Sequence, residues 1–288
     1  MLKNATDACR PGNEKNPQNC AIQVEGLSKR YGDHTVLNDL HFSVLQGEIF
    51  ALLGVNGAGK TTLLECVEGL RKYDGGNILL QGKTGIQLQS ASLPSHIRPM
   101  EAIRLFAKWN RSNVDRAMVT ALGIDEFAKR QYTDLSTGQK RRLHLALALI
   151  GDPDIVFLDE PTAGLDVEGR VSLHEQIRKL RARGKTILLA SHDMAEVESL
   201  CDRIAILKGG KIVFIGTAEE LTAKIGRRWT IHIKTDHGDE SFESDDIGDT
   251  MLTTLEEFKR RNIVILDIKI DRGTLEEHFI DIARGNGE

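Results

Sequence analysis

A glycine-rich run that begins at Gly54 constrains this 288-residue chain more than any other feature. Residues Gly54 to Thr62 read GVNGAGKTT, which fits the pattern GxxxxGK followed by Ser or Thr. The apolar run Ile49 to Leu53 precedes it, so the loop joins a buried strand to the start of a helix. Backbone N–H groups of such a loop close on a phosphate, helped by the partial charge of the helix N-terminus. The sequence therefore predicts a nucleoside triphosphate site here.

Each part of this loop has a predicted contact with the nucleotide. Lys60 is expected to reach the β- and γ-phosphates, and Thr61 to be a ligand of Mg²⁺. The residues predicted to bind the phosphates are Gly54, Asn56, Gly57, Ala58, Gly59, Lys60, Thr61 and Thr62.

Composition excludes several other classes of protein. The net charge of −4 and the isoelectric point near 6.2 argue against broad nucleic-acid binding. No stretch approaches the roughly 18 uninterrupted apolar residues of a membrane-spanning helix. Residues 1–20 are polar, so we expect a disordered tail without a secretory signal. The four cysteines show no CxxC spacing, which is typical of reduced cytosolic thiols.

The pattern of apolar residues predicts an α/β fold. Residues 21–27 and 35–45 alternate as an antiparallel strand pair would. The pattern is helical from residue 99 to about 128, and a second helix is expected from Ser136 to Ile150. Strands then alternate with helices as far as Gly216, which indicates a parallel sheet covered on both faces.

The chain changes character after Gly216. Trp229, Ile231 and Ile233 alternate as in a half-buried strand, and residues 251–261 and 263–270 are expected to form a helix and a strand. The capping box Thr274-x-x-Glu277 predicts a last helix. We expect the acidic residues 236–249 to be an exposed loop.

Two carboxylates follow the apolar run of residues 155–158. Because the carboxyl ends of parallel strands meet at one edge of a sheet, Asp159 and Glu160 are expected beside the phosphate loop. Asp159 can hold Mg²⁺ through water, and Glu160 can orient and deprotonate the attacking water.

The run Leu135 to Gln139, LSTGQ, opens the predicted helix at Ser136 and adds a second anion site. This run is similar to the signature LSGGQ, and the chain resembles the ATP-binding subunits of ABC transporters over about residues 21–218. The other family motifs follow in order and spacing. They are matched by Asp159 to Thr162 (Walker B), Ala163 to Asp166 (D-loop), Ser191 to Asp193 (switch histidine), Tyr31 (adenine stacking) and Gln89 (Q-loop, with Gln87 as the alternative).

The resemblance implies an architecture. A P-loop ATPase core of the ABC type, residues 21–218, has a RecA-like parallel sheet, an antiparallel β subdomain and a helical subdomain at about 92–150. Residues 219–288 are then a small α+β accessory unit that helps to pair two subunits.

The resemblance also implies a composite site that closes on ATP between two copies. Ser136 and Gly138, with Gln139, bind the γ-phosphate of the other copy's ATP, and Asp166 couples the two sites. The catalytic residues are then Lys60, Gln89, Glu160 and His192, and the Mg²⁺ ligands are Thr61, Gln89 and Asp159.

One residue departs from the family pattern. Thr137 stands where the signature has its first glycine. Because the expected phosphate contacts come from Ser136 and Gly138, we expect the site to survive. If position 137 required a positive φ, a β-branched residue would be costly there and hydrolysis would be weak.

The chain most resembles the ATP-binding subunits of type-2 exporters, the drug-resistance kind. Such a subunit works as a homodimer, or with a similar ATPase, on the cytoplasmic face of the membrane, bound to an integral permease on a separate chain. Two alternatives stay open: a soluble ABC ATPase that acts on ribosomes or DNA, and a regulatory ATP-binding module that does not turn over. A GTP site and a nicotinamide site are disfavoured, since NKxD and GxGxxG motifs are lacking.

Overall fold

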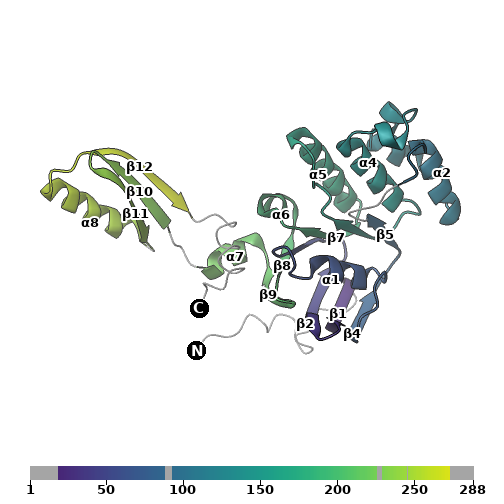
Figure 1. The fold of residues 1–288 in the computed structure, drawn as a ribbon, viewed down its shortest axis with the longest axis horizontal. Coiled ribbons are helices and arrows are strands. Elements are labelled where there is room, and N and C mark those ends of the chain that lie inside the picture. The colour runs from purple at the N-terminus through teal and green to yellow at the C-terminus, as the bar shows by residue number, and fades with distance from the viewer. Residues whose placement is uncertain (1–18, 88–92, 226–228, 245, 273–288) are drawn as a thin grey trace. The chain divides into compact units, whose positions relative to one another are not determined.

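The computed structural model describes residues 19–87, 93–225, 229–244 and 246–272 (Figure 1). The chain divides into two compact units, Met1–Ile215 and Gly216–Glu288. The predicted tail lies almost entirely outside the described residues, as do Gln89 and the helix predicted from Thr274. None of the described helices is both long and apolar enough to cross a membrane.

An antiparallel sheet in the order β2-β1-β4 forms one layer of the first unit. Ile22 and Val24 of β1 pair with Val44 and Phe42 of β2, and all four side chains are buried in the main core. The antiparallel pair predicted for this region is therefore confirmed. The strands are β1 (Cys20–Tyr31), β2 (His34–Leu45) and β4 (Gly75–Leu80).

A six-stranded sheet in the order β5-β6-β7-β3-β8-β9 forms the second layer. Its strands from β5 to β8 pair in parallel, and every residue of β3, β6 and β7 is buried, as expected of strands covered on both faces. The strands are β3 (Ile49–Leu53), β5 (Thr84–Gln87), β6 (Ile155–Asp159), β7 (Thr186–Ser191), β8 (Arg203–Lys208) and β9 (Lys211–Gly216).

The register of this sheet brings three strand ends to one edge. Leu53 of β3 lies beside Ser191 of β7, and Asp159 of β6 lies beside Ala190. The segments that follow these strands carry the phosphate loop, Glu160 and His192. The fold therefore gathers the predicted site at the carboxyl edge of the sheet.

Helices connect and cover the strands of the first unit (Figure 1). The helical pattern predicted for residues 99–128 is broken into three pieces, because Arg111 has φ 51° and Asp115 caps a new helix. The helices are α1 (Lys60–Val67), α2 (Pro99–Trp109), α3 (Arg116–Ala121), η3 (Ile124–Phe127), η4 (Tyr132–Asp134), α4 (Thr137–Ala148), α5 (Val167–Ala182) and α6 (Met194–Leu200).

The second unit has a small core of its own around Ile231, Ile233 and Phe258. The loop predicted for residues 236–249 is wrong, because β11 occupies half of it and α8 begins at Ile247. Its strands are in the order β11-β10-β12, and β11 pairs with β10 through a tight hairpin at Thr235 and Gly238. The elements are α7 (Ala218–Ile225), β10 (Trp229–Thr235), β11 (Gly238–Ser244), α8 (Ile247–Arg260) and β12 (Ile265–Arg272).

Candidate nucleotide site

The phosphate loop connects β3 to α1 and depends on its glycines. Gly57 has φ 82° and Gly59 has φ 102°, a region that residues with a side chain seldom adopt. At Gly54 a Cβ atom would lie 2.5 Å from the carbonyl oxygen of Leu207, so only glycine fits there. Ala58 is buried, whereas Asn56 and Thr61 are exposed.

Lys60 is the first residue of α1 and turns back into the loop. Its side chain is buried, and its Nζ donates to the carbonyl oxygens of Gly54 at 2.5 Å and Val55 at 3.3 Å. Burial lowers the pKa of this ammonium, while Glu160 and Asp159 oppose that shift. The loop thus holds a cation at the position where the motif predicts phosphate contacts.

Asp159 ends β6 with a buried carboxylate. Its Oδ1 has no hydrogen-bond partner among the described residues. Burial, together with the charge of Glu160, raises the pKa of Asp159 to about 6, although Lys60 opposes the shift. A buried oxygen without a partner, beside a phosphate loop, fits the hard oxygen-ligand chemistry of Mg²⁺.

Glu160 and His192 meet at the same edge. The Nδ1 of His192 lies 3.0 Å from Oε1 of Glu160, although His192 follows β7 and Glu160 follows β6. The backbone at Glu160 has φ 45°, and its N–H donates to the Ala190 carbonyl at 2.9 Å. Glu160 is mostly buried, whereas His192 is more than half exposed. The pair can hold a water against a bound phosphate group.

The predicted signature forms the N-terminus of α4. Ser136 is the N-cap: its Oγ accepts from the Gln139 N–H at 3.2 Å, and its own N–H donates to Gln139 Oε1 at 3.1 Å. Thr137 begins the helix and does not have a positive φ, so the conditional concern about backbone strain at this position is removed.

The D-loop lies against the signature. Asp166 caps α5 by accepting from the Gly169 N–H at 2.9 Å. A hollow of about 490 Å³ is lined by residues 136–139 and 164–166, among others, and none of its lining residues belongs to the phosphate loop. Gly138 remains open enough that an added Cβ would make only ordinary contact with Leu165.

Tyr31 ends β1 and is 43% exposed. Its hydroxyl accepts a hydrogen bond from Arg71 at 2.6 Å, a partner that sequence reasoning missed because it lies in another segment. Gln89 is outside the described residues, and the alternative, Gln87, is buried in β5 with no hydrogen-bond partner for its amide among the described residues.

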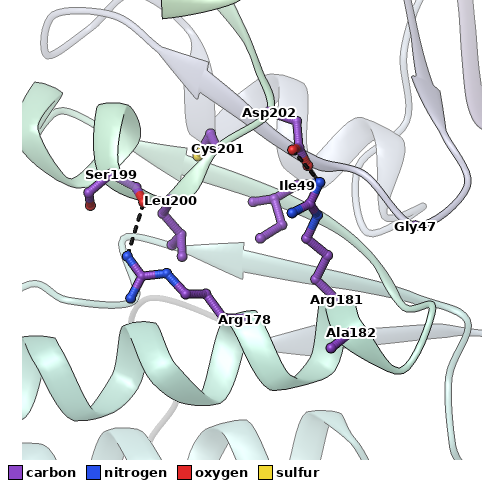
Figure 2. Close-up of a pocket in the computed structure, with 9 residues that line it drawn as sticks. All are labelled: Gly47, Ile49, Arg178, Arg181, Ala182, Ser199, Leu200, Cys201 and Asp202. Carbon is purple, nitrogen blue, oxygen red and sulfur yellow. Dashed lines mark hydrogen bonds and ion pairs between the residues drawn. The ribbon is translucent and has the colours of Figure 1, made fainter.

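A second hollow, about 470 Å³, lies at the opposite edge of the sheet, between α5 and residues 199–202 (Figure 2). Arg178 donates to the Ser199 carbonyl at 3.0 Å, and Arg181 pairs with Asp202. Asp202 also accepts from the Ile49 N–H at 2.9 Å. These contacts join α5 to the starts of β3 and β8.

Comparisons with known proteins agree with the geometry. A family model described as ABC transporter matches residues 37–163. The chain is 39% identical over 218 residues to the Nod factor export ATP-binding protein I of Burkholderia orbicola, which covers 69% of this chain and 72% of that protein. It is 34% identical over 239 residues to the linearmycin resistance ATP-binding protein LnrL of Bacillus subtilis, and the matched region covers 77% of each chain.

Solved structures share the fold. An ATP-binding subunit of an ABC transporter is 26% identical with a TM-score of 0.64, over 71% of this chain and 92% of that one. An ATP-binding cassette in its ADP conformation is 21% identical with a TM-score of 0.63, over 70% and 92%. The predicted fold class is confirmed. The chain therefore belongs to the ATP-binding subunits of ABC transporters of the exporter kind, and is a nucleotide-binding ATPase whose hydrolysis of ATP powers transport.

Proposed function

We propose that Glu160 and His192 carry out the hydrolytic step on an ATP held by the phosphate loop. Their contact at 3.0 Å, on the sheet edge that also carries the loop, is the observation that supports this most strongly. Glu160 takes a proton from the attacking water as the new bond to the γ-phosphorus forms and the bond to the ADP oxygen breaks. His192 orients Glu160 and donates to the γ-phosphate oxygens in the transition state.

Lys60 and the backbone of residues 54–62 bind the β- and γ-phosphates. The Lys60 ammonium exchanges the Gly54 and Val55 carbonyl oxygens for phosphate oxygens. Tyr31 stacks on the adenine.

Asp159, Thr61 and Gln89 would hold Mg²⁺, which neutralises charge on the phosphates when it is bound. The oxygen of Asp159 that lacks a partner among the described residues supports this assignment.

Two copies complete each site. Ser136, Gly138, Gln139 and Asp166 border a hollow without phosphate-loop residues, so their γ-phosphate contact is assigned to the ATP of a second copy. The N-terminus of α4, a 12-residue helix, favours an anion there. We infer a homodimer, or a dimer with a similar ATPase, that closes on two ATP molecules.

The dimer drives a permease carried on a separate chain, at the cytoplasmic face of the membrane. Gln89 and the adjacent region predicted to be helical, at about residues 92–130, transmit the closure to that permease, and residues 219–288 help to pair the subunits. The named relatives, which serve export and resistance, support this reading over a ribosome-acting or non-hydrolysing module.

The experiment uses the slow-turnover variant Glu160→Gln. With Mg-ATP it should form a stable dimer by light scattering and hydrolyse ATP about 10²–10⁴ times more slowly than the parent. Only monomers at saturating Mg-ATP would exclude the composite site, and unchanged turnover would remove Glu160 from the role of base. Affinity purification from detergent-solubilised membranes should yield an integral membrane protein, whereas co-purifying ribosomes would favour the soluble alternative.

A further inference from the structure

Tyr31 stands at the tip of the β1–β2 hairpin. The two residues Gly32 and Asp33 separate the strands, and Gly32 has φ 57°. Tyr31 is 43% exposed at this tip, so packing restrains its side chain less than it would restrain a buried one. A loosely held ring would lose side-chain entropy each time a base stacked on it.

Arg71 supplies the missing restraint. Its Nη1 donates to the Tyr31 hydroxyl at 2.6 Å, and its guanidinium carbon lies 5.6 Å from the ring centroid. The Lys29 ammonium lies 5.3 Å from the same centroid. Cations this close to an aromatic ring are attracted to it, but of the two only Arg71 also contacts the hydroxyl and so fixes the direction of the ring.

Glu65 in turn fixes Arg71. The Arg71 Nε donates to Glu65 Oε2 at 2.5 Å, and the Arg71 backbone N–H donates to the Glu65 carbonyl at 3.0 Å. Glu65 lies on α1, the helix whose first residue is Lys60. Hydrogen bonds through Arg71 therefore connect Tyr31 to the helix that begins with the phosphate-loop lysine.

We propose that Arg71 is a positioning residue that holds Tyr31 as the platform for the nucleotide base, and that Glu65 anchors Arg71 to the phosphate-loop helix. The proposal rests on the proposed function, in which Tyr31 stacks on adenine. It deepens that function by adding two residues, Arg71 and Glu65, that support base recognition through Tyr31 without contacting the base themselves.

A purely structural role for Arg71 is the alternative, because the same region contains a second set of contacts. Asp74 pairs with Lys29 at 3.3 Å, accepts from the Arg30 N–H at 2.6 Å, and donates its own N–H to the Ser28 carbonyl at 2.9 Å. These contacts hold the end of β1 without touching the Tyr31 hydroxyl. Asp74→Asn is therefore a matched control that loosens this region but leaves the Arg71 contact in place.

The experiment measures the dissociation constants of ATP and of inorganic tripolyphosphate for the full-length chain by calorimetry. Tripolyphosphate probes the phosphate loop alone, since it carries no base. Three single variants test the proposal: Arg71→Met, Glu65→Leu and Tyr31→Phe. Each should raise the dissociation constant of ATP about threefold to tenfold, which is the range expected for the loss of one hydrogen bond. Tripolyphosphate affinity should stay within about twofold.

A double variant tests whether the residues act together. The double variant, Arg71→Met with Tyr31→Phe, should weaken ATP binding no more than either change alone, because both changes remove the same hydrogen bond. Additive losses would overturn the proposal, as would unchanged ATP affinity in Arg71→Met, an equal loss for tripolyphosphate, or the same loss in Asp74→Asn.

Tyr31→Ala separates failure of this inference from failure of the proposed function. If Tyr31→Ala leaves ATP affinity unchanged, the base does not stack on Tyr31. The proposed base site is then wrong, and so is the positioning role of Arg71 and Glu65. If Tyr31→Ala weakens ATP binding but Tyr31→Phe and Arg71→Met do not, the proposed base site is supported and only the positioning role of Arg71 and Glu65 is overturned.

Discussion

The imidazole of His192 contacts the carboxylate of Glu160 at 3.0 Å across two neighbouring strands, β6 and β7. The β6–β7 register places Asp159 beside Ala190, and the Ala190 carbonyl accepts the N–H of Glu160. The backbone ladder of the sheet thus sets the distance between two side chains of the proposed catalytic pair.

Replacing His192 by Ala should separate nucleotide binding from turnover. We expect hydrolysis to fall about 10²–10³-fold, because a transition-state donor and the orientation of Glu160 are both lost. The dissociation constant of ATP should change by less than about threefold, because Lys60 and the loop remain. The measurement is steady-state phosphate release together with equilibrium binding. His232→Ala, in the second unit, is the control; a large loss of ATP affinity in His192→Ala would contradict the assignment.

Thr137→Gly should bring no gain in hydrolysis. Thr137 begins α4 without a positive φ, so restoring the family's glycine relieves no strain. Glycine in a helix costs about 0.5–1 kcal/mol, which should appear as a slightly lower unfolding free energy in urea. ATPase activity should stay within about threefold of the parent, since Ser136 and Gly138 keep their positions. A rise of tenfold or more in turnover would show that Thr137 restrains the site.

Asp159→Asn should stabilise the nucleotide-free protein while removing its response to Mg²⁺. Burial and Glu160 raise the pKa of Asp159 to about 6 from a usual value near 3.8. The stability it contributes is therefore present below pH 3.8 and is lost as the pH rises through 6. At pH 7.5 the neutral amide should raise the free energy of unfolding by up to about 3 kcal/mol.

Thermal melts with and without Mg-ATP check this. The melting temperature of Asp159→Asn should be higher without ligand and should not increase further when Mg²⁺ is added to ATP. Asp154→Asn, at the other end of β6, should retain the Mg²⁺ response. A Mg²⁺-dependent shift that persists in Asp159→Asn would remove this residue from the metal site.

His144 should make the fold sensitive to acid. The imidazole is buried on α4 with its Nε2 3.0 Å from the Tyr132 hydroxyl, and burial, with Arg141 and Lys140, lowers its pKa to about 4. The unfolded chain binds a proton near pH 6.5, so stability is full above that value and is lost as the pH falls toward 4.

Urea unfolding of the parent and of His144→Gln at pH 7 and pH 5 isolates this effect. From pH 7 to pH 5 the free energy of unfolding should fall by about 2 kcal/mol more in the parent than in the variant. The comparison is needed because raised carboxyl pKa values at Glu68 and Asp159 act in the opposite direction over part of this range. Equal losses in both proteins would show that His144 does not carry the dependence.

Local chemistry explains which features the sequence predicted. The N-cap at Ser136 and the strand before Asp159 follow from capping and apolar runs, which need no distant partner. The strand β11 was predicted as a loop because it lies at the edge of its sheet: Asp239 and Ser241 are exposed and only alternate residues face the core.

Contacts between distant segments could not be predicted in this way. Arg71 meets Tyr31 across 40 positions, and the run that contains Arg71 carries no pattern that distinguishes it from a helix end. The same holds for the β6–β7 register that pairs Glu160 with His192, since register depends on the packing of whole strands. The resemblance to a family supplied the roles of Tyr31, Glu160 and His192, but not the contact between Arg71 and Tyr31.

The left-handed backbone at Glu160, φ 45°, has a consequence for engineering. Most residues with a β-carbon pay about 1 kcal/mol for that conformation, whereas glycine avoids this cost and asparagine reduces it. Selection for thermostability alone would therefore push this position toward residues that cannot accept a proton from water. Any stabilised version of the chain should keep Glu160 unchanged, because the residue that is best for stability at this position is not the one that the proposed hydrolysis requires.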